Sequence, residues 1–153
     1  MLLTNASATE RSHVSPSAVT TVCEGRVRNG FGLVRPPGHH ATKNDLCGFS
    51  LCNSVAIAAR HALSNLNVSK VLIVDFDVHH GQGTQYEFYD DPRVLYTSIH
   101  RYDFGKYWPY LRESDFDHIG VDGGKGFNLN IPLNSKDLED ADYLAIFHQG
   151  RNE

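Results

Sequence analysis

Residues 71–83 read VLIVDFDVHHGQG, an apolar run that ends in two aspartates, two histidines and two glycines. The continuous β-branched and leucine character of residues 70–74 predicts a strand of a parallel sheet, covered by other elements on both faces. In an extended chain, side chains two positions apart point the same way, so Asp75, Asp77 and His79 are expected to project together from the end of this strand. The stretch therefore predicts a buried strand that brings carboxylates and imidazoles to one edge of a sheet.

Strands and helices alternate along the rest of the chain. The expected elements are a short strand at 31–34, a helix from Asn53 or Ser54 to Leu66, a short helix at 84–89, a strand at 94–99, a half-buried strand in which Phe127, Leu129 and Ile131 alternate with asparagines, and a final helix that Ser135 caps and that turns Leu138, Ala141, Leu144, Ala145 and Phe147 inward. This alternation predicts the α/β class, with a mostly parallel open sheet and helices on both faces. Residues 1–20 lack apolar periodicity and are expected to form a mobile arm or the start of a weak helix.

A second pair of histidines follows a turn sequence. The Pro-Pro-Gly sequence at 36–38 ends the strand expected at 31–34 and places His39 and His40 in a loop. Ligands of open parallel sheets gather beyond the carboxyl ends of the strands, where both histidine groups are expected. Asp77 and His79 offer a carboxylate oxygen and an imidazole nitrogen, a pair that suits zinc. A catalytic zinc uses three protein ligands, of which this pattern supplies two.

The metal site competes with a plainer interpretation. An isolated Asp-x-His at a strand end is more often a hydrogen-bonded pair than a metal site. Several carboxylates and imidazoles at one strand end, together with GHH at 38–40, favour the metal site here. The remaining histidines are not expected at the metal site. His61 and His100 are expected on the surface or in the core, and His13, His118 and His148, which have no supporting neighbours, are expected to face solvent.

Composition excludes some classes of function. The chain has 153 residues, 41% of them apolar, and a formal charge of -4 without a long run of like charges, so it presents no basic footprint for nucleic acid or an anionic membrane. Three cysteines without a CxxC spacing argue against a disulfide scaffold or a structural zinc knuckle. The N-terminal residues lack the apolar core of a secretion signal, so the expectation is an intracellular protein, in the cytoplasm or the nucleus, that forms one domain or part of one.

Several motifs, in this order, resemble those of the zinc-dependent histone deacetylases. They are RPPGHH at 35–40, GF at 48–49 with Asn53, VLIVDFDVHHGQGTQ at 71–85, LYTSIHRYDFGKYWP at 95–109 and GFNLNIPL at 126–133. The GQG and HRYDFGKYWP variants look most like the class II branch, and the resemblance runs from about Val27 to Phe147. It implies the arginase/deacetylase fold and zinc-dependent hydrolysis of the amide of acetyl-lysine. The implied substrate is an acetylated histone, with a role in chromatin regulation, a cytoskeletal protein such as tubulin, or a small acetyl-polyamine.

The resemblance also implies roles for individual residues. Asp77 and His79 look like two of the three zinc ligands, and His39 and His40 look like the paired catalytic histidines. Zinc polarises an acetyl carbonyl and acidifies water, so a neutral imidazole beside it can take a proton and later pass it to the leaving amine. By this resemblance, His40 would be that base and His39 would stabilise charge beside it.

Each catalytic imidazole needs a partner on its far nitrogen to fix its tautomer. The resemblance gives Asp75 to His39 and Gln82 to His40. Other branches of the family carry a carboxylate at the position of Gln82. Without that anion, His40 is expected to be less basic and neutral near pH 7.

Two further kinds of site follow from the resemblance. One monovalent cation, K+ or Na+, would be held by backbone carbonyls of Asp75, Asp77, His79 and Ile99, the carboxylate of Asp75 and the hydroxyl of Ser98, and a second one by Phe88, Asp91 and Val94. Gly48, Phe49 and Trp108 would line the tunnel for the acyl-lysine chain, which two aromatic faces would grip. The plainer alternative is that Phe49 and Trp108 are core aromatic residues.

The resemblance ends near the C-terminus. The family's third zinc ligand, an aspartate, and its transition-state tyrosine lie beyond the helix that ends near His148, and residues 150–153 do not follow the family pattern. The sequence therefore predicts a partial catalytic domain at 21–149, followed by a non-family tail, that is inactive on its own. Asp137, Asp140 and Asp142 are expected on the solvated face of the final helix and not at the metal.

Two other functions stay open at this point. One is an inert chain, or one that acts only by binding partners; the sequence predicts no particular oligomeric state. The other comes from the Asp-x-Asp after an apolar strand, which also resembles the haloacid-dehalogenase phosphohydrolases, with Asp75 as nucleophile and Asp77 as acid and base. That alternative leaves His79 and the GHH loop without a role.

Overall fold

The computed structural model, which describes residues 11–149, contains both α-helices and β-strands. The elements are α1 (Arg11–Cys23), α2 (Ser54–Asn65), β1 (Val71–Asp75), α3 (Gln82–Phe88), β2 (Val94–Arg101), β3 (Asn128–Leu133) and α4 (Asp140–Gln149). This confirms the α/β class. Residues 11–20 belong to α1, whereas the rest of the arm predicted at 1–20 and the tail predicted at 150–153 lie outside the described residues. None of the described helices is long and apolar enough to cross a membrane.

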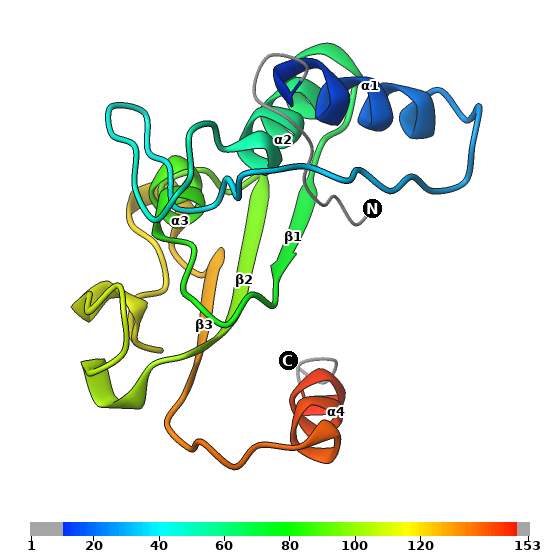
Figure 1. The fold of residues 1–153 in the computed structure, drawn as a ribbon. Helices are drawn as coiled ribbons and strands as arrows, with labels where there is room; N and C mark the ends of the chain where they lie inside the picture. The colour runs from blue at the N-terminus through cyan, green and yellow to red at the C-terminus, as the bar shows by residue number, and fades with distance from the viewer. Residues whose placement is uncertain (1–10, 150–153) are drawn as a thin grey trace.

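Three parallel strands form the sheet in the order β1-β2-β3. Asp75 at the end of β1 pairs with Ser98 of β2, and His100 of β2 pairs with Pro132 of β3. Because the strands run the same way, their carboxyl ends lie at one edge of the sheet (Figure 1). The parallel arrangement predicted from residues 70–74 is therefore confirmed, and it brings the loops after β1 and β2 together.

Helices α2 and α3 cover one face of the sheet. Asn53, one of the two residues at which the sequence predicts this helix to start, caps α2, because its side-chain oxygen accepts the N–H of Ala56 at 3.0 Å. The core beneath the two helices consists of Ala56, Ala59, Ile73, Phe88, Val94 and Tyr96. Helix α1 lies against α2, where Val19 meets Ala58 and Ala62 (Figure 1).

The opposite face of the sheet is open in the described part of the chain. Leu72 of β1 and Leu129 of β3 are exposed there. The sequence predicts helices on both faces, and the structure meets this expectation on one face only. Continuous apolar character shows that a strand can be covered on both faces, but it does not show that the covering elements lie within these residues.

Strand β3 buries its asparagines and not its leucine. Asn128 and Asn130 are 4% and 2% exposed, whereas Leu129 is 41% exposed. The predicted inward alternation of the apolar residues is therefore wrong. Gln85 of α3 explains the inversion, because its Oε1 accepts N–H groups from Asn128 and Asn130 at 3.1 and 2.9 Å.

Residues 31–34 form no strand, so the strand predicted there is wrong. Phe31 and Leu33 are exposed, while Val34 is buried. The segment alternates as a strand would, but a strand also needs a neighbour that exchanges backbone hydrogen bonds with it.

Helix α4 begins at Asp140 and not at Ser135. Asp142 supports its first turn by accepting the N–H of Glu139 at 2.8 Å. None of the residues described for α4 is buried, so the inward face predicted for this helix, from Leu138 to Phe147, is wrong. Helix α4 lies apart from the sheet in Figure 1.

Candidate active site

Tight packing between two helix N-termini positions the loop that carries both catalytic histidine candidates. A side chain at Gly38 would come within 2.7 Å of the carbonyl oxygen of Cys52, and one at Gly83 within 2.2 Å of that of Ala41. The N–H of Thr84 in α3 donates to the carbonyl oxygen of His39 at 3.1 Å. Glycine is therefore required at both places for backbone to approach backbone this closely.

His39 takes part in a buried carboxylate pair. Its Nδ1–H donates to Asp75 Oδ2 at 2.8 Å, and the hydroxyl of Tyr96 lies 3.0 Å from the same oxygen. Burial alone disfavours the imidazolium, but the hydrogen bond with Asp75, with the charges of Asp75 and Asp77, raises the pKa of His39. Burial likewise opposes ionisation of Asp75, yet the hydrogen bond and charge of His39 lower the pKa of Asp75. The contacts between the two side chains therefore favour the ion pair over its neutral form.

His40 has a neutral partner. Its Nδ1 lies 2.8 Å from Gln82 Oε1, and because an amide oxygen only accepts, Nδ1 carries the hydrogen and Nε2 keeps a free electron pair. Gln82 Nε2 in turn donates to the sulfur of Cys47 at 3.4 Å. Burial, followed by the positive charge of His39, lowers the pKa of His40 to about 4. His40 is therefore a neutral base at pH 7.

Asp77 and His79 lie together in the turn that follows β1. Asp77 Oδ1 accepts the backbone N–H of His79 at 2.8 Å and lies 3.3 Å from His79 Nδ1. Two ligand atoms at about 2.0–2.1 Å from a tetrahedral zinc lie roughly 3.3 Å from each other, so this pair fits two corners of a zinc site. Within residues 11–149, no group of three or more histidine, cysteine, aspartate or glutamate side chains has metal-binding geometry.

The two histidine pairs face one locus. The ring centroids of His39 and His40 are 3.9 Å apart, and those of His40 and His79 are 5.9 Å apart. His39 Nε2 lies 3.9 Å from Asp77 Oδ1. The imidazoles of His39, His40 and His79 and the carboxylate of Asp77 thus lie around one locus.

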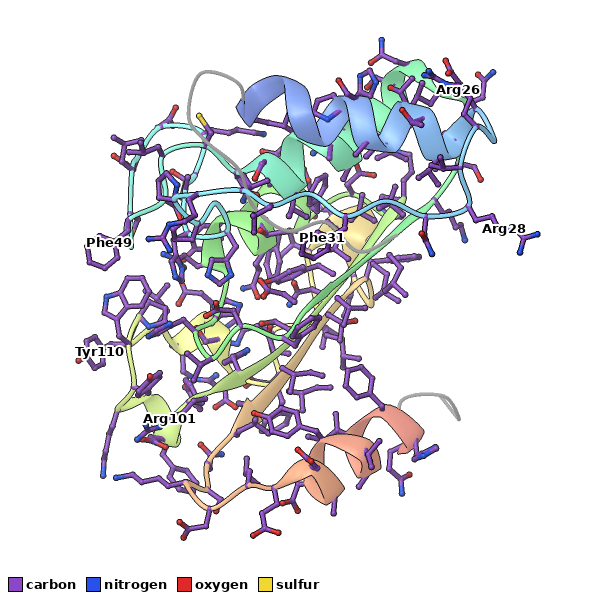
Figure 2. All side chains as sticks on the ribbon, turned by 45° about the vertical axis from the view of Figure 1, so that its right-hand side comes forward. Arg26, Arg28, Phe31, Phe49, Arg101 and Tyr110 are labelled. Carbon is purple, nitrogen blue, oxygen red and sulfur yellow. The ribbon has the colours of Figure 1, made fainter. Side chains whose placement is uncertain are left out.

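Trp108 forms a wall of this space. Its ring meets His40 edge-on at 4.5 Å and His79 edge-on at 5.4 Å between centroids. A side chain at Gly48 would come within 2.4 Å of His40 and 2.6 Å of Trp108, so the glycine leaves room between them. Phe49 is 90% exposed and projects away from the molecule (Figure 2).

An apolar cavity of about 710 Å³ lies on the other side of His39, along β1 and α2. It reaches Asp75 and Asp77 but includes neither Phe49 nor Trp108. This cavity follows the outer edge of β1 and is separate from the wall that Trp108 forms.

The residues expected to hold two monovalent cations form two separate sets, one at the ends of β1 and β2 and one between α3 and β2. Asp75 and Ser98 are register partners on β1 and β2, and Ser98 Oγ lies 2.9 Å from His100 Nδ1. Since His100 Nε2 donates to the carbonyl oxygen of Ser114, its Nδ1 accepts the Ser98 hydroxyl hydrogen and leaves the oxygen's electron pairs available. In the second set, the carbonyls of Phe88 and Asp91 accept the N–H groups of Asp91 and Val94 at 3.0 and 3.2 Å.

Three supporting residues were not predicted from the sequence: Tyr96, Cys47 and His80. Tyr96 gave no signal because an aromatic residue in a buried strand is usually core. His80 is fully buried, with Nδ1 accepting from Ser114 Oγ and Nε2 donating to Gln85 Oε1, both at 2.8 Å. The side chains of His79 and His80 point to opposite sides, because neighbouring residues in an extended chain do so.

Asp75 is poorly suited to the phosphohydrolase alternative. A nucleophilic carboxylate has to reach a phosphorus atom, but this side chain is 13% exposed and both His39 and Tyr96 contact its Oδ2. This oxygen is therefore already occupied by two hydrogen bonds.

Comparison with known proteins agrees with this geometry. The Histone deacetylase domain family matches residues 4–152. Polyamine deacetylase HDAC10 of Rattus norvegicus is 54% identical over 129 residues, which are 84% of this chain and 22% of that protein. Histone deacetylase 6 of Caenorhabditis elegans is 58% identical over 121 residues, 78% of this chain and 13% of that protein. Histone deacetylase HDA1 of Candida albicans is 47% identical over 134 residues, 86% of this chain and 16% of that protein.

These relatives are much longer than the 153 residues, which span about a fifth of their length or less. The match nevertheless covers nearly the whole of this chain and includes both histidine loops. The chain therefore belongs to the histone deacetylase domain family.

Proposed function

We propose that these residues form part of the active site of a zinc-dependent deacetylase, which hydrolyses the amide bond of an acetylated amine. The observation that supports this best is the contrast between two adjacent imidazoles. His39 pairs with the carboxylate of Asp75, whereas His40 pairs with the neutral amide of Gln82. One is therefore held positive and the other neutral, as amide hydrolysis requires of a charge stabiliser and a base.

His40 is the general base in this proposal. Its Nε2 accepts a proton from the attacking water, while Gln82 Oε1 keeps the Nδ1–H in place. The protonated ring then gives this proton to the leaving amine. His39 remains charged through its bond to Asp75 and stabilises the negative charge that develops on the acetyl oxygen.

Asp77 and His79 would hold zinc at this locus. When bound, zinc polarises an acetyl carbonyl and lowers the pKa of water. The two side chains supply fewer than the three protein ligands of a catalytic zinc. We therefore propose that the 153-residue chain alone binds zinc weakly and has no measurable deacetylase activity, even though it contains both histidine pairs.

The substrate class follows from the wall of the site. Trp108 would pack against the alkyl chain of an acetylated amine, with Gly48 leaving room beside His40. Phe49, which is 90% exposed, would contact this chain only where it leaves the site. Acetyl-lysine in a protein and an acetylated polyamine both have such a chain. The names of the relatives include both polyamine and histone deacetylases, so we propose to test both substrates. Cytoplasm or nucleus is the compartment that such substrates imply, and K+ or Na+ at the strand ends would support the turn.

A direct test measures zinc binding and hydrolysis separately. Zinc affinity is measured by competition with a chelator for the chain and for Asp77→Ala and His79→Ala. Hydrolysis of an acetyl-lysine peptide and of an acetylated polyamine is followed for the chain and for a longer polypeptide that contains it. We expect both substitutions to abolish zinc binding, and activity in the longer polypeptide to fall at least a hundredfold with His40→Ala.

Two results would contradict the proposal. Zinc affinity that neither substitution changes would mean that the metal does not bind this pair. Zinc-dependent turnover by the 153-residue chain, above that of a His39→Ala and His40→Ala control, would mean that its residues form a complete site.

A further inference from the structure

We propose that Tyr107, supported by Arg101, is a positioning residue that holds the His79 ring in the orientation a metal ion needs. The inference rests on the proposed function, because it concerns how that site is prepared for its metal. It adds a role for the last residue of β2, Arg101 (Figure 2), and for the loop that follows this strand.

The first observation is a continuous stack of three side chains. The ring of Tyr107 lies parallel to that of His79, with an interplanar angle of 14° and centroids 5.2 Å apart. The guanidinium carbon of Arg101 lies 4.2 Å from the centroid of the same tyrosine. A planar cation over an aromatic face is attracted by the ring quadrupole, so the ring of Tyr107 contacts both a cation and an imidazole.

The second observation is that Arg101 is itself held in place. Its Nε donates to Asp103 Oδ2 at 2.9 Å, and its Nη2 donates to the same oxygen. Its backbone N–H donates to the carbonyl oxygen of Val78 at 2.9 Å, which ties β2 directly to the turn that carries His79. The stack therefore begins at a backbone anchor next to the residue that it orients.

The loop between these residues has a strained but well-supported shape. Asp103 and Phe104 both have left-handed backbone angles, with φ of 50° and 55°, which residues with a side chain adopt rarely. The N–H of Phe104 is held by Asn134 Oδ1 at 2.7 Å, and the N–H of Tyr107 by the carbonyl oxygen of Tyr102 at 3.1 Å. Strain of this kind persists only where surrounding contacts impose it, and the tight loop that results puts Tyr107 against His79.

The third observation concerns what His79 lacks. Metal-binding histidines almost always donate their second ring N–H to a carboxylate, a carbonyl or water, which fixes the ring. Among the described residues, His79 Nδ1 faces Asp77, but no side chain or backbone group accepts from Nε2. The ring is instead enclosed by Tyr107 on its face and the edge of Trp108. Aromatic contact thus takes the place that a hydrogen bond usually has.

A matched pair of substitutions separates stacking from simple packing. Tyr107→Phe keeps the aromatic face. Tyr107→Leu removes the aromatic face but keeps an apolar side chain. In the metal-free 153-residue chain, we expect the proton resonances of the His79 ring to move in Tyr107→Leu, as the ring current is lost, and to change little in Tyr107→Phe. Amide spectra of both variants show whether each remains folded.

Metal affinity gives the second measurement, with Co2+ and Zn2+ as probes and His79→Ala as the control without a site. Loss of a group that orients a metal ligand typically lowers affinity about 10- to 100-fold, so we expect at least a tenfold loss in Tyr107→Leu and at most about threefold in Tyr107→Phe. Folded Tyr107→Leu with unchanged His79 resonances and wild-type affinity would overturn the inference and leave the proposed function intact. Equal metal binding by wild type and His79→Ala would overturn the metal site itself, and the inference with it.

Discussion

Two neighbouring imidazoles have opposite electrostatic environments because their partners differ. His39 donates to a carboxylate, which favours the imidazolium and raises its pKa. His40 donates to an amide and has the charged His39 beside it, so that burial and this charge lower its pKa to about 4. The proposed division of roles between the two histidines therefore depends on whether the group that accepts the Nδ1–H is a carboxylate or an amide.

Gln82→Glu should reverse this division at His40. A carboxylate at this position favours the charged imidazole, so we expect the pKa of His40 to rise by about one to three pH units. Titration of the ring resonances by NMR measures the change. Gln82→Met is the control, because it removes the amide without adding a charge; an equal rise in both variants would contradict the electrostatic explanation.

Gly81 lies where the His39 pair has no spare volume. A Cβ there would come within 2.5 Å of Asp75 Oδ2, 2.6 Å of Tyr96 Oη and 2.8 Å of His39 Nδ1. We expect Gly81→Ala to break the His39–Asp75 hydrogen bond and to lower the free energy of unfolding by about 1 to 3 kcal/mol, as overpacking usually does. Thermal unfolding checks this against Gly123→Ala, whose Cβ meets nothing within 3.4 Å. Equal effects would contradict it.

The sequence predicted the partners of both histidines because they belong to recognisable motifs. Asp75 and Gln82 stand at fixed places beside the strand and the glycine loop, and the structure brings each within hydrogen-bonding distance of the expected histidine. Tyr96 could not be predicted in the same way. Its hydroxyl meets Asp75 only because β2 lies next to β1, and strand order is not visible in a local pattern.

At the scale of elements, α2, β1, α3 and β2 follow their local patterns, whereas β3 and α4 do not. The helix after Asn53 has a cap and an apolar stripe that both find partners. Strand β3 inverts its expected faces because Gln85 and a backbone carbonyl accept the side-chain N–H groups of Asn128 and Asn130. Side-chain amides that find donors or acceptors elsewhere in the chain override alternation, and that long-range pairing cannot be read from residues 127–131 alone.

Arg60 joins α2 to the end of α3. Its guanidinium donates to Glu87 Oε1 and to the carbonyl oxygen of Glu87, both at 2.7 Å, donates to Asp91, and lies over the ring of Phe88 at 4.6 Å. We expect Arg60→Ala to lower the free energy of unfolding by about 1 to 3 kcal/mol, because several charge-assisted bonds are lost together.

The comparison for Arg60 is Arg112, which pairs with Asp117 on the surface. Exposed ion pairs contribute between about 0 and 1 kcal/mol, so Arg112→Ala should change stability little. Urea denaturation of both variants tests the difference. A smaller loss in Arg60→Ala than in Arg112→Ala would show that α2 and α3 are held by apolar contacts alone.

For the molecule as a whole, acid should be strongly destabilising. Burial, followed by the charge of His100, lowers the pKa of His80 to about 3, so below pH 6.5 the unfolded chain binds a proton that the folded chain does not. The contribution of His80 to stability therefore rises with pH between about 3 and 6.5 and is constant above that window, where it amounts to at most roughly 4 to 5 kcal/mol. Denaturation at pH 7 and pH 4.5 measures it, and His80→Gln should flatten the dependence. Equal slopes in both proteins would exclude His80.

The open face of the sheet predicts self-association. Leu72 and Leu129 are exposed on strands whose backbone edges are also available, and large exposed apolar patches favour association. We expect sedimentation velocity to show concentration-dependent dimers or larger species, and Leu129→Lys to reduce them. Leu46→Lys, which replaces an exposed leucine in a loop away from the sheet, is the control. A monomer at all concentrations would contradict this prediction.

The turn after β1 is fixed before any metal arrives. Asp75 Oδ1 accepts the N–H of Asp77 at 3.2 Å, and Asp77 Oδ1 accepts the N–H of His79. The carboxylate that would bind zinc therefore already restrains the backbone of its co-ligand. Ordering a residue costs about 1 to 2 kcal/mol of conformational entropy. In this turn, the residues are already ordered when β1 and the turn fold. Metal binding at this turn then needs no disorder-to-order transition, and capture can be fast even where retention is weak.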